Sequence, residues 1–476
     1  MQVAMTKLLL TLVALFAIAS QPDQTVDGEI ADVEKLTVSR LNETGGLGVV
    51  FTLIDEHEIK ATRAFGQANT RGDAISAEMI FAAASMTKPV TAVSILQLEH
   101  EGKVDLDAPV SRYLPWFVGH EPKLAVRIRV RDLLNHRSGF SRASGVRNGM
   151  LAGDIPTEDP DKFRRIVNAT RLVHQPGDTF EYSNLNFHLL GQIIEAVTGE
   201  TYANYIEASV FSPLGLSASN MNSLPRGHAS AGQHRMIFGM PVALKRDRAI
   251  AGAAGGLFTT TDDYARFLIA VATEDERLLP SGTLARILSE PSGAYRLGWQ
   301  IAESSDHGTI IFHNGWAFGG SSTGGIAPAT GRGFVSMTNA AEGYIAGDTP
   351  AITDHPRALA FGNPVGKPRS FWFQRGLFAT VILLAVAHLF WFWHLSRDKS
   401  RPHAAILIIA SGVQATAGLA MPLLLPRLFA GDFRSTLDLY PTAATALLIA
   451  GAAMIAVSLM RFKGLRSQEL KRLILR

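Results

Sequence analysis

The spacing of hydrophobic and polar residues predicts a body that begins and ends in strands. A helical period over residues 29–41 precedes two β-rich runs, residues 46–55 and 58–65, and a short polar turn separates these runs. Later strand-like runs are residues 297–302, 309–314 and 333–338. Amphipathic helices are expected between them, at residues 86–100, 130–135, 160–170, 186–198, 202–210 and 261–273. We therefore expect an α+β fold whose terminal strands share one antiparallel sheet.

Long apolar runs at both ends of the chain indicate export and membrane insertion. The first run follows Lys7 and ends in small residues, so residues 1–19 are predicted to be a signal peptide. Near the other end, three runs each approach the ~20 residues that a helix needs to cross a bilayer. They are residues 377–395, 404–425 and 440–460. We predict a folded body at residues 20–365 and a multi-pass membrane domain at residues 366–476, with the lipid bilayer as its partner.

The distribution of charge fits one orientation of this membrane domain. The first predicted loop holds Arg397, Lys399 and Arg401, and the tail after residue 460 is also basic. Under the positive-inside rule both face the cytoplasm, which leaves the body on the periplasmic or extracytoplasmic side. Residues 366–476 carry 14 Lys and Arg against 4 Asp and Glu, whereas the first 365 residues carry 31 against 38. The overall charge of +3 therefore gives no indication of nucleic-acid binding.

The candidate nucleophile is Ser85, which stands three residues before Lys88. Pro89 is tolerated only in the first turn of a helix, so a helix should begin here and place both side chains on one face. A serine hydroxyl needs an adjacent base, and a lysine supplies one when burial lowers its pKa. Ser396 and Lys399 have the same spacing in a predicted cytoplasmic loop, which shows that this spacing alone is weak.

Two further groups of residues have the chemistry that such a nucleophile requires. In Tyr182-Ser183-Asn184, the phenol can relay a proton to the leaving group and Asn184 can hydrogen-bond a substrate amide. His313-Asn314-Gly315 lies on a strand-like run, where a glycine lets a substrate backbone approach. The N–H that follows Gly315 can then join the N–H of Ser85 in an oxyanion hole.

In this order, the three groups resemble the motifs of penicillin-binding proteins, class C β-lactamases, D-amino-acid peptidases and related esterases. The resemblance extends to further stretches, at residues 133–139, 255–257 and 297–299. It implies a β-lactamase/transpeptidase-like fold, in which helices flank an antiparallel sheet and an all-helical domain is added. It also implies that Ser85 is acylated, that Lys88 and Tyr182 share proton transfer, and that the N–H groups of Ser85 and Trp316 bind the oxyanion. Asn184, His313 and Gly315 would line the site.

The third motif departs from the resemblance, because many members have Lys-Thr-Gly where this chain has His313-Asn314-Gly315. A lysine is a permanent cation that anchors a substrate carboxylate, whereas a histidine is mostly neutral near pH 7. The departure favours aminopeptidase, amidase or esterase activity over carboxypeptidase or β-lactamase activity. The layout of leader, body and three terminal helices is similar to that of membrane-bound peptidases that remove an N-acyl-D-amino-acid cap from prodrugs.

Three functions are compatible with the sequence. The first is a membrane-anchored serine hydrolase that cleaves an amide or ester, such as a D-amino-acid-containing peptide or a β-lactam, through an acyl-enzyme on Ser85. The second is a penicillin-binding receptor that is acylated but turns over slowly, and the third is a non-catalytic binding protein. The absence of cysteine excludes thiol chemistry and cysteine-bound zinc. The histidines lack metal-site spacing, so neither a metal nor a cofactor is expected. The sequence leaves the substrate and the oligomeric state open.

Overall fold

The fold is taken from a computed structural model. It describes residues 26–142, 144, 160–225, 227–244, 252–317, 319–341, 349–368 and 444–459, together with isolated positions between 376 and 416. The predicted signal peptide and most of the predicted membrane domain lie outside the described residues.

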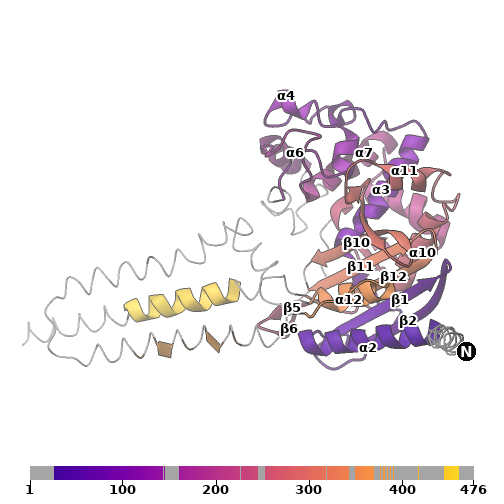
Figure 1. The fold of residues 1–476 in the computed structure, drawn as a ribbon. Coiled ribbons are helices and arrows are strands. Elements are labelled where there is room, and N and C mark those ends of the chain that lie inside the picture. Colours follow the sequence, from indigo (N-terminus) through magenta and orange to yellow (C-terminus); the bar gives the residue numbers. More distant parts are fainter. Residues whose placement is uncertain are drawn as a thin grey trace, which may run out of the picture.

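A seven-stranded antiparallel sheet organises the body (Figure 1), with the strand order β2-β1-β12-β11-β10-β9-β8. Its strands are β1 (Gly48–Asp55), β2 (Glu58–Gly66), β8 (Tyr295–Arg296), β9 (Trp299–Ser304), β10 (Gly308–Ala317), β11 (Gly320–Ala327) and β12 (Arg332–Thr338). Strand β1 pairs with β12 from Val49↔Thr338 to Ile54↔Gly333. The prediction that the first and last strands share one sheet is therefore confirmed.

Helices bury both faces of this sheet, as the alternation of side chains along β12 shows. Phe334 packs in a cluster with residues of α2 (Val26–Thr44) and α12 (Ala351–Ala360). Val335 and Met337 belong to the larger core, which also contains Tyr264 and Phe267 of α10 (Thr261–Ala272). Since successive side chains of a strand point to opposite faces, α2 and α12 cover one face and α10 lies on the other.

The remaining helices form a second region above the sheet in Figure 1. They are α3 (Thr87–His100), α4 (Pro122–Ala125), α5 (Val130–Leu134), α6 (Pro160–Ala169), α7 (Asn184–Thr198), α8 (Tyr202–Ile206), α9 (Ser212–Leu214) and α11 (Thr283–Ser289), with a π-helical turn at Glu207–Phe211. Short 3-10 turns occupy Ala84–Met86, Val110–Arg112 and Gly252–Ala254. The α+β class and the helical region both agree with the sequence prediction.

Two small sheets complete the body. One has the order β3-β7-β4, from β3 (Phe81–Ala82), β7 (Leu257–Thr259) and β4 (Asn220–Met221). The other has the order β13-β5-β6, from β13 (Ala340–Ala341), β5 (His234–Ile237) and β6 (Met240–Ala243). The first sheet ends next to Ser85, because β3 stops three residues before it.

The expected strand at residues 297–302 is shifted. Strand β9 begins at Trp299, and Leu297 and Gly298 form the tight turn that joins it to β8, with φ values of 43° and 91°. A Cβ at Gly298 would lie 2.3 Å from the Cβ of Ala92 in α3, so this turn needs a glycine both for its conformation and for its packing.

Part of the predicted membrane domain is described. Residues 444–459, within the run predicted as the third spanning helix, are helical (yellow in Figure 1). Among the residues that the structure describes, no helix has the length and apolar character needed to cross a bilayer.

Candidate active site

Ser85 lies in a 3-10 turn that runs directly into α3, at the junction of the main sheet and the helical region. Ala84 before it has a φ of 50°, in the left-handed region that costs a non-glycine residue energy. Hydrogen bonds hold this turn: the Ala83 N–H donates to the Leu257 carbonyl at 2.8 Å, and the Leu257 N–H donates to Thr87 Oγ1 at 3.0 Å. The surrounding strands thus fix a strained backbone that leaves Ser85 9% exposed.

Lys88 faces Ser85 across one helical turn, as the sequence predicted. Its Nζ lies 2.9 Å from Ser85 Oγ, and the side chain is completely buried. Two carbonyl oxygens accept hydrogen bonds from the same Nζ, Asn184 Oδ1 at 2.9 Å and the Ala254 oxygen at 2.7 Å. Burial lowers the pKa of Lys88 well below its usual value, because the charged form loses its hydration.

These contacts determine what a neutral Lys88 can do. Carbonyl oxygens only accept hydrogen bonds, so Asn184 Oδ1 and the Ala254 oxygen take both hydrogens of a neutral amine. The remaining lone pair of Nζ then points to its third neighbour, Ser85 Oγ, and can accept the hydroxyl proton. This geometry allows a neutral Lys88 to act as a base for Ser85.

Tyr182 is the second group in contact with the nucleophile. Its hydroxyl donates to Ser85 Oγ at 2.8 Å, and its ring centroid lies 4.9 Å from Lys88 Nζ. Burial raises the pKa of Tyr182, with a smaller opposing effect from its hydrogen bond to Ser85. The phenol therefore keeps its proton near neutral pH and is placed to deliver it to a leaving group.

His136 packs against the Tyr182 ring. It belongs to residues 133–139, which extend the family resemblance, but its sequence context predicted no role for it. The two ring centroids are 4.3 Å apart. The Ser183 N–H, at 3.2 Å, and Asn186 Nδ2, at 3.0 Å, lie around His136 Nδ1, which must accept because a backbone N–H only donates. Burial lowers the pKa of His136 well below its usual value, so this ring is a neutral support that fixes the start of α7.

His313 is also buried and neutral. Its Nδ1 donates to the Asn314 carbonyl at 2.7 Å, and its Nε2, 3.1 Å from the Tyr295 hydroxyl, is left to accept. Burial, with a smaller contribution from Lys88, lowers the pKa of His313 to about 3. Both ring nitrogens are engaged and the ring carries no charge at neutral pH, so His313 does not replace a cationic lysine.

Gly315 explains how β10 reaches the nucleophile. A Cβ at this position would lie 2.3 Å from the carbonyl oxygen of Ala83, two residues before Ser85. Strand β9 pairs with β10 only from Gly308 to Phe312, so beyond Phe312 this edge of β10 has no strand partner within the described sheet. The part of this edge near Gly315 therefore packs beside the turn that carries Ser85. The oxyanion role of the Ser85 and Trp316 N–H groups stays a prediction.

Asn184 lies at the predicted site, at the beginning of α7, with 8% of its surface exposed. Its Oδ1 faces Lys88 rather than solvent, which makes it a positioning residue for the base. The predicted contact with a substrate amide is left to its Nδ2.

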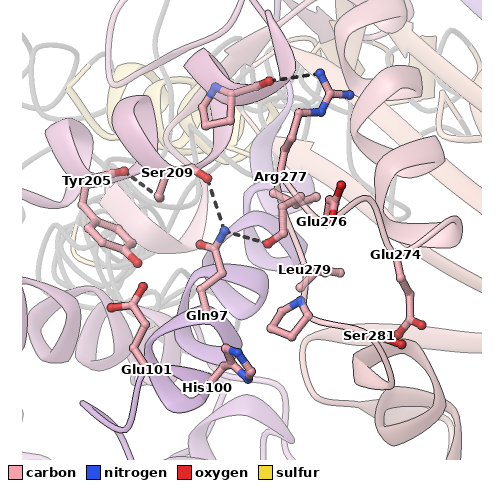
Figure 2. Close-up of a pocket in the computed structure, with 13 residues that line it drawn as sticks. Gln97, His100, Glu101, Tyr205, Ser209, Glu274, Glu276, Arg277, Leu279 and Ser281 are labelled. Carbon is pink, nitrogen blue, oxygen red and sulfur yellow. Dashed lines mark hydrogen bonds between the residues drawn. The ribbon is translucent and has the colours of Figure 1, made fainter.

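A separate cavity lies at the other end of α3 and is not the Ser85 site. It has a volume of about 710 Å³ (Figure 2), and its lining residue Gln97 is nine residues beyond Lys88, about 14 Å along the helix axis. Its lining includes Glu101, Glu274 and Glu276. Among the residues that the structure describes, no cluster of histidine and carboxylate side chains is arranged to hold a metal ion.

On this fold, the hydroxyl of Ser85 is in contact with both Lys88 and Tyr182. A family model described as Beta-lactamase matches residues 33–355, and the chain belongs to that family.

Comparison with individual proteins agrees with this family. Protein flp of Staphylococcus aureus is 28% identical over 289 residues, which cover 57% of this chain and 54% of that protein. The chain thus spans about half the length of the curated relatives that it matches. A solved octameric penicillin-binding protein homologue from Pyrococcus abyssi has a TM-score of 0.61 and 24% identity, over 70% of this chain and 78% of that chain. A D-stereospecific amidohydrolase from Streptomyces has a TM-score of 0.53 and 26% identity, over 64% and 94%.

The contacts of Lys88 predict the effect of replacing it with arginine. An arginine stays protonated at all accessible pH values, so Lys88→Arg replaces the neutral base with a cation that cannot accept the Ser85 proton. We expect acylation of Ser85 by a fluorophosphonate to slow by about 100-fold or more, the usual contribution of a general base. Stopped-flow or quenched labelling followed by intact-mass spectrometry measures this rate.

The matched control is Lys103→Arg, since Lys103 is an exposed lysine that pairs with Glu101 at 2.7 Å. This variant should label at the wild-type rate. A Lys88→Arg protein that labels within about twofold of wild type would show that Lys88 is not the base.

Proposed function

We propose that the protein is a serine hydrolase that cleaves an amide or ester through an acyl-enzyme on Ser85. The observation that carries this proposal is the pair of contacts on one oxygen atom. A buried amine and a half-buried phenol both lie within hydrogen-bond distance of Ser85 Oγ, at 2.9 and 2.8 Å. This combination supplies both proton transfers that acyl transfer requires.

The reaction begins with transfer of the Ser85 hydroxyl proton to neutral Lys88 as Oγ attacks the substrate carbonyl. Tyr182 then gives its proton to the leaving nitrogen or oxygen, the bond to the leaving group breaks, and the proton on Lys88 restores the phenol. Water attacks the acyl-enzyme in the second half, returning a proton to Ser85 and releasing a carboxylic acid. No proton is gained or lost by the protein over the cycle.

The oxyanion of each tetrahedral intermediate is bound in this proposal by the backbone N–H groups of Ser85 and Trp316. The close approach of β10 at Gly315 supports it, since that approach brings the backbone of this strand beside the nucleophile. Backbone donors fixed in advance stabilise the developing charge more than mobile water does.

The preferred substrate in this proposal contains a D-amino acid. The likeness to a D-stereospecific amidohydrolase supports this preference. The neutral state of His313 disfavours a substrate that relies on a cation at the third motif, which is the feature of carboxypeptidases and β-lactamases with Lys-Thr-Gly. Amides and esters without that requirement are favoured.

The alternative functions differ from the hydrolase in the fate of the acyl group. A slowly hydrolysing receptor would accumulate the acyl-enzyme, and a binding protein would form none. The contacts at Ser85 argue against the binding protein, because burying a lysine without a partner charge costs free energy that binding alone does not explain.

Intact-mass spectrometry tests the nucleophile. We expect the full-length protein to gain one adduct with a fluorophosphonate and, if it accepts D-peptide-like substrates, one with a penicillin. Ser85→Ala should gain neither. Ser396→Ala is the matched control, because it removes the serine of the other Ser-x-x-Lys sequence, and it should label fully.

Each outcome separates the three functions. A fluorophosphonate adduct that needs Ser85 establishes the nucleophile, and its combination with multiple turnovers of an ester establishes the hydrolase. A stable adduct with every substrate favours the receptor. An unlabelled protein, or labelling that persists in Ser85→Ala, contradicts the proposed function.

We further propose that residues 366–476 anchor the protein in a membrane, with the body on the extracytoplasmic side. The three apolar runs and the basic residues that flank them support this arrangement. The helical conformation of residues 444–459, with Leu448 and Leu459 exposed, is compatible with contact with lipid.

Membrane fractionation tests the anchor. The full chain should stay in the membrane pellet after alkaline carbonate extraction, and a chain that ends at residue 368 should be released. Release of the full chain by carbonate would contradict the anchor and leave the chemistry of Ser85 untouched.

A further inference from the structure

Neither Lys88 nor His313 offers a free positive charge to a substrate at Ser85. Lys88 is completely buried and holds three partners, and His313 is neutral with both nitrogens engaged. Neither residue is available to attract an anionic group of a substrate. A cation for that purpose must come from elsewhere around the site.

Arg142 is a cation next to the reactive groups. Its guanidinium carbon lies 5.6 Å from the centre of the Tyr182 ring, whose hydroxyl contacts Ser85, and the residue is exposed. The positive charge of Arg142 affects the pKa of two site residues, Tyr182 and His136. Burial raises the pKa of Tyr182 and Arg142 partly opposes this rise, whereas burial lowers the pKa of His136 and Arg142 adds slightly to that fall.

The guanidinium of Arg142 has N–H donors that can bind a ligand. Glu181 accepts from the backbone N–H of Arg142 at 2.8 Å, and the guanidinium forms no ion pair with any residue that the structure describes. Other arginines nearby are used differently: Arg137 donates to the carbonyls of Gly177 and Asp178, and Arg296 donates to those of Leu288 and Gly293. The position of Arg142 is also fixed locally, since the Ser144 N–H donates to the Ser141 carbonyl at 3.1 Å in the turn around it.

We propose that Arg142 binds a carboxylate, or a similar anion, on the leaving group of the substrate. In the proposed function, on which this inference rests, Tyr182 protonates the leaving group, so a cation over the Tyr182 ring lies on the leaving-group side. A leaving group of one or two residues, each about 3.5 Å long when extended, reaches from Ser85 past this ring. The planar guanidinium presents a fork of N–H donors that matches a carboxylate.

In this proposal Arg142 binds the substrate carboxylate, as the lysine of the third motif does in many relatives. Arg142 belongs to a different segment of the chain. The site is selective for anionic leaving groups although His313 carries no charge. Selectivity of this kind affects binding and orientation of the substrate, while the proton transfers stay with Lys88 and Tyr182.

The test uses two esters that differ only in charge. The acetyl esters of 4-hydroxybenzoate and of 4-hydroxybenzamide have leaving groups of the same shape, one anionic and one neutral. The readout is the ratio of kcat/KM for the anionic ester to that for the neutral ester, measured with the full-length protein. Intrinsic differences in reactivity cancel when this ratio is compared between variants.

We expect Arg142→Gln to lower the ratio by about fivefold, the upper range for an exposed ion pair. Arg164→Gln is the matched control, because the Arg164 guanidinium also lies 5.6 Å from an aromatic ring, that of Trp116, and Arg164 is in α6. Its ratio should equal that of wild type. Fluorophosphonate labelling of each variant at Ser85 confirms that its site is folded.

A salt titration gives a second measurement that needs no variant. Raising the ionic strength from about 50 mM to about 500 mM should lower the ratio in the wild type, because salt screens an exposed ion pair. A ratio that is unchanged in a labelled Arg142→Gln protein, that falls equally in Arg164→Gln, or that does not respond to salt overturns the role of Arg142. Failure of the wild type to hydrolyse either ester would instead contradict the proposed function.

Discussion

A buried lysine is the constraint on which the site depends. Removing an ammonium group from water is costly, and Lys88 sits in the core beside Ser85 with no carboxylate among its hydrogen-bond partners. The neutral amine is the form that this environment favours, and its two carbonyl partners, on Asn184 and Ala254, direct the free lone pair at the nucleophile. Through these two hydrogen bonds, Lys88 of α3 contacts both the start of α7 and the turn at Gly252–Ala254.

The other buried polar residues extend the same principle. His136 is neutral, packs under Tyr182 and holds the Ser183 N–H, while His313 is neutral and holds the Tyr295 hydroxyl. Neither ring adds a positive charge to the interior around Lys88. The cation at Arg142 lies on the exposed side of the site, where it can act on a substrate without ionising the interior.

Local sequence patterns predicted much of this structure. The helix after Ser85, the hairpin of β1 and β2 and the pairing of terminal strands all follow from period and order. Strand β11 was not predicted, because it contains three glycines, which have low β propensity. A Cβ at Gly324 would lie 2.7 Å from the Tyr264 ring, so close packing requires a glycine there. Helix α12 was also missed, since Pro356 lies inside it. Within the site, spacing predicted that Ser85 and Lys88 lie together, and the order of the motifs added Tyr182, which the structure places beside them. The neutral state of Lys88, the support from His136 and the place of Arg142 depend on contacts across the fold, which no local pattern contains.

The central claim is that Lys88 is a neutral base at working pH. The most direct test is the rate of Ser85 acylation by a fluorophosphonate between pH 5 and pH 11. The rate should rise with pH as Lys88 loses its proton and should level off, with a midpoint well below 10.5, because burial lowers the pKa of this amine. Tyr182 should add no second inflection below pH 10, since burial raises its pKa. A midpoint at or above 10.5 would contradict this claim.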